Sequence, residues 1–251
     1  MRPATDVAQV IDLAAHGVSE KEIARRLSTS RETVQRWLQS DPELLLIRRE
    51  PCRGGESCPR VAAAPRACLA YLLGLYLGDG HIVIMRNGVA KLTIYCADDY
   101  PHLMARCEAV LASVMPQSKD GRQQRQGCVA VHSHSKHWLC LFPQHGTGRK
   151  HERSIALTPW QRPLLEEHPK ALLAGLLHSD GCRAINRVQS RGRWYAYPRY
   201  FFSNMSTDIL GIFGDTCDQL GIEWRFNRPN SISIARRRSV EQLDLFVGPK
   251  R

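Results

Sequence analysis

Two aspartates, Asp79 and Asp180, follow two similar apolar segments and could bind a divalent cation together. The first ends the segment YLLGLYLGDG and the second ends ALLAGLLHSDG, and both segments predict buried helices. Two unpaired carboxylates at helix C-termini are unfavourable, because the helix dipole and the neighbouring negative charge both oppose ionisation. A divalent cation bound between them removes this penalty. The alternative is that the two aspartates only begin Asp-Gly turns and hold no metal.

Each predicted helix carries small residues four positions apart, Gly74 and Gly78 in the first and Gly175 and Ser179 in the second. This spacing places the small residues of a helix on one face and lets two helix backbones approach closely. We expect these two faces to pack against each other. The two carboxylates would then lie side by side at the end of the contact.

The order of elements after each aspartate is the same, and the aspartates are 101 positions apart, which indicates an internal duplication. The elements predicted after the first are a hairpin around Asn87-Gly88, a helix over 100–114 and a strand over 128–134. Those predicted after the second are strands over 182–188 and 195–204, a helix over 207–220 and a strand over 231–235. Helices packed on antiparallel strands make the predicted fold class α+β.

The motifs LLGLYLGDG at 72–80 and LAGLLHSDG at 173–181 resemble the two signature motifs of single-chain LAGLIDADG homing endonucleases. The resemblance covers roughly residues 67–247. It implies a monomer with an internal pseudo-twofold axis, in which the strands of two repeats form a saddle over the major groove of duplex DNA. It also implies that Asp79 and Asp180 bind Mg²⁺ on this axis and are the catalytic residues of DNA cleavage, one for each strand.

The same resemblance implies a basic catalytic residue after the last strand of each repeat, where it would stabilise the developing phosphate charge. Lys136 follows the strand VAVHSHS, and Arg236 and Arg237 follow SISIA. A solvated basic surface is the alternative at all three positions. The sixth position of the signature, usually acidic, is Leu77 in one copy and His178 in the other, and this position is not the metal ligand.

The first 40 residues predict three short helices. Gly17 suits a left-handed cap after the first, and Ser19 with Glu22 has the capping-box pattern at the start of the second. The segment EIARRLSTSRETVQRW resembles the helix-turn-helix of resolvases, invertases and transposases over residues 5–39, with Ser28 where such motifs often have glycine. A structural or protein-binding module is the alternative. In a helix-turn-helix the third helix enters the major groove, and its exposed candidates for DNA contact are Arg31, Glu32, Thr33, Gln35 and Arg36.

The chain carries 35 Lys and Arg against 24 Asp and Glu, a net charge of +11 that favours a nucleic-acid partner. In the second repeat, arginines alternate with aromatic residues along the predicted hairpin, whereas the first repeat has fewer basic residues. The candidates on these strands, together with Arg236 and Arg237, are Arg86, Lys91, Arg183, Arg187, Arg191, Arg193 and Arg199. The sequence has no run of apolar residues long enough for a membrane helix and no secretory signal pattern, so we expect a cytoplasmic, DNA-associated protein.

The predicted organisation is a helix-turn-helix domain, a Pro- and Gly-rich linker expected to be free of core packing, and two repeats joined by a second, basic linker. The corresponding ranges are 1–40, 41–66, 67–142, 143–168 and 169–251. Cys52 and Cys58 lie within the first linker as C-x5-C, with no second pair nearby, so incidental thiols are favoured over metal ligands. His132, His134 and His137 are explained by alternating strand positions as readily as by zinc.

Three functions fit these features. The first is sequence-specific binding of double-stranded DNA with Mg²⁺-dependent cleavage, which the retained Asp79 and Asp180 favour. The second is a transcription regulator built on the same fold without cleavage, which the added helix-turn-helix favours. The third is an RNA maturase, which the charge allows, although a helix suited to the major groove argues for duplex DNA.

Overall fold

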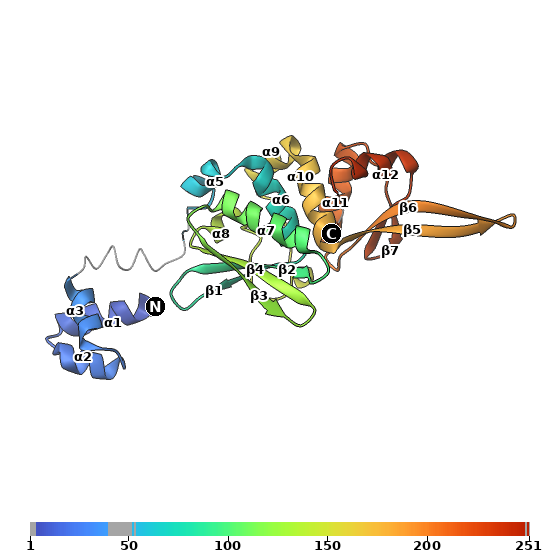
Figure 1. Ribbon diagram of the computed structural model, residues 1–251. Coiled ribbons are helices and arrows are strands. Elements are labelled where there is room, and N and C mark those ends of the chain that lie inside the picture. Colours follow the sequence, from blue (N-terminus) through green and yellow to red (C-terminus); the bar gives the residue numbers. More distant parts are fainter. Residues whose placement is uncertain (1–3, 40–51, 53, 249, 251) are drawn as a thin grey trace.

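The computed structural model describes residues 4–39, 52, 54–248 and 250. Figure 1 shows three small helices at the N-terminal end and a larger part in which helices lie on one side of two sheets. The predicted fold class, α+β with two repeats preceded by a small all-α domain, is confirmed. The first half of the predicted linker, residues 41–51, lies outside the described residues.

The N-terminal helices are α1 (Ala4–Ala15), α2 (Glu20–Arg26) and α3 (Arg31–Gln39). Gly17 ends the first with a φ of 75°, and Ser28 adopts a φ of 47° between the second and third, a left-handed conformation that glycine adopts at lower cost. Ser19 accepts a hydrogen bond from the backbone N of Glu22, as predicted. The Glu22 carboxylate pairs with Arg25 and Arg26, so the reciprocal half of the predicted capping box is wrong. This small domain has its own core, formed by Val7, Val10, Ile23, Ala24, Val34 and Trp37.

Two four-stranded antiparallel sheets form the larger part, with the equivalent strand orders β1-β2-β4-β3 and β5-β6-β8-β7. The first contains β1 (Gly80–Ile84), β2 (Ala90–Ala97), β3 (Lys119–Arg125) and β4 (Cys128–Ser135). The second contains β5 (Gly181–Ser190), β6 (Arg193–Ser203), β7 (Arg225–Arg228) and β8 (Ser231–Ile234). The matching order of the two sheets shows the duplication that the sequence predicted.

The longer helices flank the sheets in equivalent places. They are α6 (Arg66–Leu77) and α7 (Pro101–Val114) in the first repeat, and α10 (Pro169–Asp180) and α11 (Thr207–Gln219) in the second. We call α6 through α8 the first repeat and α10 through α12 the second. The shorter helices are α5 (Pro59–Ala63), α8 (Trp138–Leu141), α9 (Gln161–Glu167) and α12 (Arg237–Asp244), with 3₁₀ turns at Gly55–Ser57 and Lys150–Glu152.

The second half of the predicted linker is part of the core. Cys58 and Ala64 are buried there, 1% and 6% exposed, and α5 lies between them. The prediction that this segment would be free of core packing is wrong for these residues. Pro59 begins the short helix, whose two alanines are exposed, and the buried residues Cys58 and Ala64 lie directly before and after it.

The helices α6 and α10 pack against each other at the centre of the molecule (Figure 1). A Cβ atom added to Gly74 would lie 2.5 Å from the carbonyl oxygen of Leu172, and one added to Gly175 would collide with the carbonyl oxygen of Tyr71. The two backbones therefore approach too closely for any side chain. We call this contact the seam, and the small-residue pairing that the sequence predicted is confirmed there.

Candidate active site and DNA-binding surface

The seam brings the two predicted acidic residues to one place. α6 ends at Leu77, two residues before Asp79, whereas α10 includes Asp180 as its last residue. A Cβ added to Gly78 would collide with Ser179 and lie 3.0 Å from the Asp180 carboxylate oxygen Oδ2. The small residues thus determine how closely the ends of the two helices, and with them the carboxylates, approach.

Both carboxylates are held in conditions that oppose their ionisation. Burial, followed by the charge of Asp180, raises the pKa of Asp79 to about 6. Burial also raises the pKa of Asp180, while a hydrogen bond from Asn204 opposes the rise. The Asn204 amide Nδ2 donates to Asp180 Oδ2 over 2.5 Å, and its Oδ1 accepts from the backbone N of Ser206 over 2.8 Å, which orients the amide. The predicted electrostatic conflict between the two acids is therefore present.

Two lysines that the sequence analysis did not select lie beside these carboxylates. Lys150 Nζ donates to the carbonyl oxygens of Tyr76, Leu77 and Gly78, the last over 2.7 Å. These carbonyls have no partner within the helix, so the lysine satisfies them and opposes the negative end of the helix dipole. Lys150 thus caps the C-terminus of α6 directly before the first aspartate.

Lys250 does the same for the second helix. Its Nζ donates to the carbonyl oxygens of Ser179 over 2.8 Å and Gly181 over 2.5 Å, on either side of Asp180. Burial lowers the pKa of both lysines, that of Lys150 to about 8, while the two aspartates raise it. Each helix end is therefore capped by one lysine from a later segment of the chain, and each lysine interacts most strongly with the other carboxylate, Lys150 with Asp180 and Lys250 with Asp79.

A repeated sequence signal could have identified these lysines. Both follow the pattern Gly-x-Lys, at 148–150 and at 248–250, and they lie 71 and 70 positions after their aspartates. The first pattern lies in the predicted basic linker between the repeats, and the second follows the last predicted strand of the second repeat.

The basic residues predicted to assist catalysis lie elsewhere. Lys136 follows Ser135, which pairs with Ala90, whereas Gly80, next to the first aspartate, pairs with Ile94 further along the same strand. Lys136 is therefore beyond the opposite end of the sheet. Arg236 pairs with Glu223 over 3.2 Å, and Arg237 pairs with Glu241 over 2.9 Å within α12. The structure does not bring these three residues to the carboxylates. A position directly after the last strand of a repeat does not determine which end of the sheet the residue lies at.

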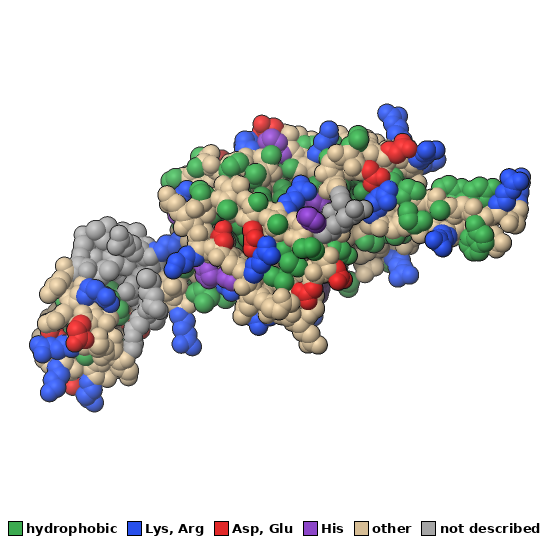
Figure 2. Space-filling view, in the orientation of Figure 1, with side chains coloured by type: hydrophobic (Ala, Val, Ile, Leu, Met, Phe, Trp, Pro, Cys, Tyr) green, Lys and Arg blue, Asp and Glu red, His purple; other side chains and the backbone are tan. Residues whose placement is uncertain are grey.

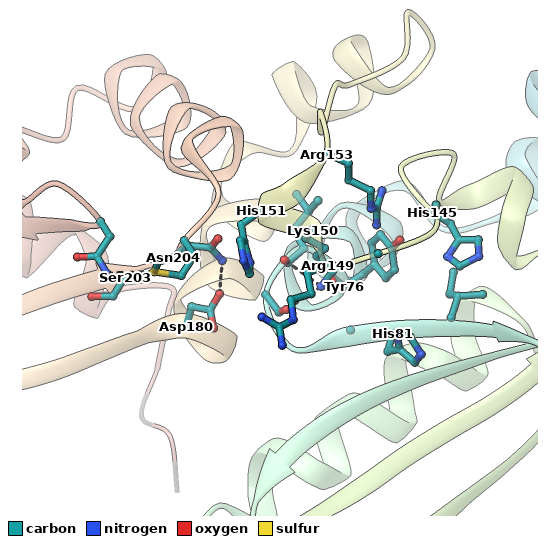
Figure 3. Close-up of a pocket in the computed structure, with 18 residues that line it drawn as sticks. Tyr76, His81, His145, Arg149, Lys150, His151, Arg153, Asp180, Ser203 and Asn204 are labelled. Carbon is teal, nitrogen blue, oxygen red and sulfur yellow. Dashed lines mark hydrogen bonds between the residues drawn. The ribbon is translucent and has the colours of Figure 1, made fainter.

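A pocket of about 570 Å³ opens at the seam. Figure 3 shows Lys150 between Tyr76 of the first repeat and the hydrogen-bonded pair Asp180 and Asn204 of the second. Arg149 lines the same space. The Asp180 carboxylate of the second repeat and the cations Arg149, Lys150 and Arg153 of the segment between the repeats thus line one opening.

His178, at the sixth position of the second motif, has a structural role. It is 3% exposed, and its Nδ1 lies 2.8 Å from the Tyr71 hydroxyl. Burial lowers its pKa to about 4, so the imidazole is neutral near pH 7. It links α10 to α6 within the seam.

The face of the first sheet that points away from the helices, which we call its outer face, carries several polar side chains. The strand register places His81, Thr93 and His132 in one row and Lys91 and His134 in the next. His132 and His134 form an edge-to-face pair with ring centroids 5.3 Å apart. Arg86 is exposed in the turn between β1 and β2.

The outer face of the second sheet is richer in arginine and aromatic residues. Side chains alternate between the two faces along β6. Tyr200 and Phe202 are buried on the helix side, so the odd-numbered positions of the strand face away from the helices. These positions carry Arg193, Tyr195, Tyr197 and Arg199, and the two tyrosine rings stack with centroids 6.1 Å apart. Figure 2 shows hydrophobic side chains along the projecting β5–β6 hairpin and basic side chains at its tip. Arginine on a sheet can bond to guanine edges and phosphates.

The other predicted arginines of the hairpin divide between its opposite face and its tip. Arg183 lies on the helix side, where it forms two hydrogen bonds of 2.8 Å with Asp244, and Arg187 lies on the same side of β5. Arg191 occupies the two-residue turn with a φ of 49°. Two further arginines, not selected from the sequence, lie on β7 opposite outer-face positions of β8, namely Arg225 and Arg228. They were missed because this four-residue strand has no alternating apolar pattern.

The helix-turn-helix candidates lie along α3. Arg31 and Arg36 are exposed, whereas Thr33 and Gln35 are partly buried. Arg31 pairs with Glu20 over 3.1 Å, and the Thr33 hydroxyl lies 3.0 Å from that of Ser30. The exposed side of α3 thus carries two arginines and one acidic candidate, Glu32.

The comparisons with known proteins concern the two parts separately. Residues 4–40 match the family model of the homeodomain-like domain. No match to the chain was found among curated protein sequences. Similar solved structures include I-DmoI in complex with DNA and Mn, at 14% identity and a TM-score of 0.49, covering 73% of this chain and 98% of that one. Another is the LAGLIDADG meganuclease I-AabMI bound to uncleaved DNA, at 10% identity and a TM-score of 0.46, covering 71% and 82%.

A third similar structure is the meganuclease I-SmaMI bound to uncleavable DNA, at 9% identity and a TM-score of 0.45, covering 72% of this chain and 83% of that one. The similarity to single-chain LAGLIDADG homing endonucleases that the two motifs carry is thus also found among solved structures. Within the described residues, no helix has the length and apolar character needed to span a membrane.

Proposed function

We propose that the protein binds a specific double-stranded DNA site and hydrolyses both strands in a Mg²⁺-dependent reaction. The observation that carries this proposal is the pair of partly buried carboxylates, Asp79 and Asp180, at the seam of two equivalent repeats. Their surroundings raise both pKa values, and bound divalent cations would compensate that cost. The retained acids favour the nuclease over a non-cleaving regulator.

The chemistry of the site fits a divalent cation. Carboxylate oxygens are preferred ligands of Mg²⁺, which binds through one or two carboxylates together with waters and phosphate oxygens. Asp79 and Asp180 supply such oxygens, and their mutual repulsion is itself a reason to bind a cation. A bound ion would supply activation of the attacking water and stabilisation of the leaving oxygen.

The remaining residues of the site support these two acids. Asn204 orients the Asp180 carboxylate through its amide hydrogen bond. Lys150 and Lys250 hold the backbone on which the acids are carried and add positive charge beside the position of a phosphate. Because both lysines are largely buried, their charges act in a medium that screens them weakly.

The outer faces of the two sheets are proposed as the DNA-binding surface. The second sheet would contact one half of the site through Arg193 and Arg199, and the first through Lys91 and the histidines beside it. The exposed arginines of α3, Arg31 and Arg36, would contact a separate segment of the same duplex. The protein would act as a monomer, because one chain supplies both halves of the site.

A selection on random duplexes tests the proposal. The full chain is incubated with a library of linear duplexes in Ca²⁺ or in Mg²⁺, and bound and cut molecules are sequenced. We expect one enriched site in Ca²⁺ and double-strand breaks within that site in Mg²⁺. A site that is enriched but remains uncut in Mg²⁺ and Mn²⁺ would support the transcription regulator. The absence of any enriched duplex would contradict DNA recognition itself.

A further inference from the structure

The sequence analysis favoured incidental thiols at Cys52 and Cys58, but the fold brings further ligands to them. Cys52 Sγ and Cys58 Sγ are 3.9 Å apart. Cys140, from α8, joins them, so that the three sulfur atoms lie within 4.8 Å of one another. The cluster combines residues 88 positions apart in the chain, which a search for two close cysteine pairs does not find.

A histidine lies beside Cys58, although its ring is not among the ligand atoms that all lie within 4.8 Å of one another. His137 Nδ1 lies 3.2 Å from Cys58 Sγ, and His137 is separated from Cys140 by two residues, one helical turn away. The three thiols and one imidazole are a Cys₃His donor set, one of the usual sets of structural zinc sites. His132 and His134, with which His137 was first grouped, lie on the sheet and take no part.

The separation of the Cys52 and Cys58 sulfur atoms matches metal coordination and excludes a disulfide between them in this arrangement. Zinc–sulfur bonds of about 2.3 Å in a tetrahedron place two sulfur atoms about 3.8 Å apart. The sulfur atoms of Cys52 and Cys58 have nearly this separation, which is far beyond the roughly 2.0 Å of a disulfide.

The backbone is arranged to bring these ligands together. Gly54 and Gly55 make the turn between the two cysteines, and Gly55 has a φ of 50°, which favours glycine. A Cβ on Gly54 would lie 3.3 Å from the backbone of Cys58. The backbone N of Cys52 donates to the carbonyl oxygen of Lys136 over 2.9 Å, which attaches this segment to the end of β4.

We propose that Cys52, Cys58, His137 and Cys140 bind one structural Zn²⁺ ion. Four protein ligands fill a tetrahedron and leave no open position, so the site is structural rather than catalytic. The ion would join the chain entering the first repeat to the β4–α8 corner of its sheet. It would therefore fix the point from which the N-terminal helices are tethered to the DNA-binding saddle.

The first experiment measures metal in the full-length protein purified under reducing conditions. We expect one equivalent of zinc by elemental analysis after gel filtration. Cobalt added to the zinc-free protein should give the intense visible bands of a tetrahedral ion and thiolate-to-cobalt charge transfer in the near ultraviolet. Folded, reduced protein that takes up neither ion would overturn the proposal, as would a disulfide between Cys52 and Cys58 found by mass spectrometry of protein purified with its thiols blocked at lysis.

Variants assign the ligands. Cys58→Ser and Cys140→Ser should lower bound zinc at least tenfold, whereas Cys182→Ser, which changes an exposed cysteine outside the cluster, should retain the full equivalent. His137→Cys keeps four ligands, so it should retain the ion and strengthen the cobalt charge-transfer band. This last variant is informative even if the serine variants fail to fold. Zinc that is retained in both serine variants, or a cobalt spectrum unchanged by His137→Cys, would contradict the assignment.

Discussion

The two repeats share a strand order but surround their carboxylates differently. Gly80 pairs with Ile94 in the first sheet and Gly181 pairs with Phe202 in the second, so the residues two positions further along, Cys96 and Asn204, are equivalent. Asn204 donates a hydrogen bond to its carboxylate. Cys96 is buried within the core, where a hydrogen bond with Cys107 lowers its pKa and the Asp79 charge opposes this effect. The strand order is thus the same in the two repeats, whereas the residues beside the two carboxylates differ.

The outer faces of the sheets differ in the same sense. The first presents histidines and Lys91, whereas the second presents Arg193 and Arg199 with stacked tyrosines on a longer hairpin. Arginine offers several fixed donors to a base or phosphate, which neutral histidine cannot match. The comparison indicates that the second repeat supplies more of the DNA-binding energy, and that the two halves of the target are unlike.

The largest effect is expected from removing either carboxylate charge. Asp79→Asn and Asp180→Asn should each lower double-strand cleavage by about 100-fold or more, because a neutral amide binds a cation weakly and several kcal/mol of transition-state stabilisation is lost. Binding should persist in Ca²⁺. Gel assays with each strand labelled measure both. If each aspartate serves one DNA strand, the two variants should nick opposite strands. Wild-type cleavage rates in both variants would contradict a cleavage site shared by Asp79 and Asp180.

The next effect concerns the seam that the repeats share. Gly175→Ala forces a Cβ into the carbonyl of Tyr71, and we expect a loss of about 1 to 3 kcal/mol in the free energy of unfolding. Gly211→Ala is the matched control, since it lies within α11 with no atom within 4 Å of the added Cβ. It should leave stability unchanged or increase it by roughly 0.5 kcal/mol. Urea unfolding compares the two, and equal stabilities would disprove the close helix contact.

The difference between the two carboxylates should appear in the pH dependence of stability. The folded-state pKa of Asp79 is about 6, above the usual 3.8, so its contribution to stability is present below pH 3.8 and is lost as the pH rises through about 6. In metal-free protein Asp79→Asn should therefore become more stable than wild type between pH 4 and 7 by on the order of 2 kcal/mol. Urea titrations at several pH values measure this. Mg²⁺ should stabilise wild type above about pH 6, and a pH-independent difference between the two proteins would be inconsistent with the raised pKa.

A smaller effect tests the unequal DNA-binding faces. Arg193→Ala and Arg199→Ala should each weaken binding by roughly 1 to 2 kcal/mol, whereas Lys91→Ala, which removes a single screened charge, should cost less. Arg66→Ala is the control, because Arg66 is an exposed residue of α6 that pairs with Glu167 of α9 and is not a candidate for DNA contact. Affinities on the selected duplex at two salt concentrations provide the comparison. A larger loss of affinity for Lys91→Ala than for either arginine variant would contradict the claim that the second repeat supplies more of the DNA-binding energy.

Much of the repeat scaffold could be predicted from sequence, because strong local signals encode it. The small residues Gly74 and Gly175 and the Asp-Gly turns recur at a fixed interval, and the helices and hairpins after them have clear periodicity. β3 and β7 could not be predicted, since their polar, exposed edge positions lack alternation.

Only part of the candidate site could be predicted from the sequence in this way. Asp79 and Asp180 are carried by the motifs, but Lys150, Lys250 and Asn204 come from loops whose return to the seam depends on tertiary packing. Lys136 lies beyond the opposite end of the sheet from Asp79, because a residue after the last strand can emerge at either end of a sheet.

The central claim is that one divalent-ion site forms between the repeats on a duplex. The most direct test is a crystal structure of the full chain with its selected duplex and Mn²⁺, using anomalous scattering to locate the ion. We predict anomalous density between Asp79 and Asp180, in contact with phosphate oxygens of DNA lying across both outer faces. Duplex bound across these faces with no manganese at the two carboxylates would contradict the account.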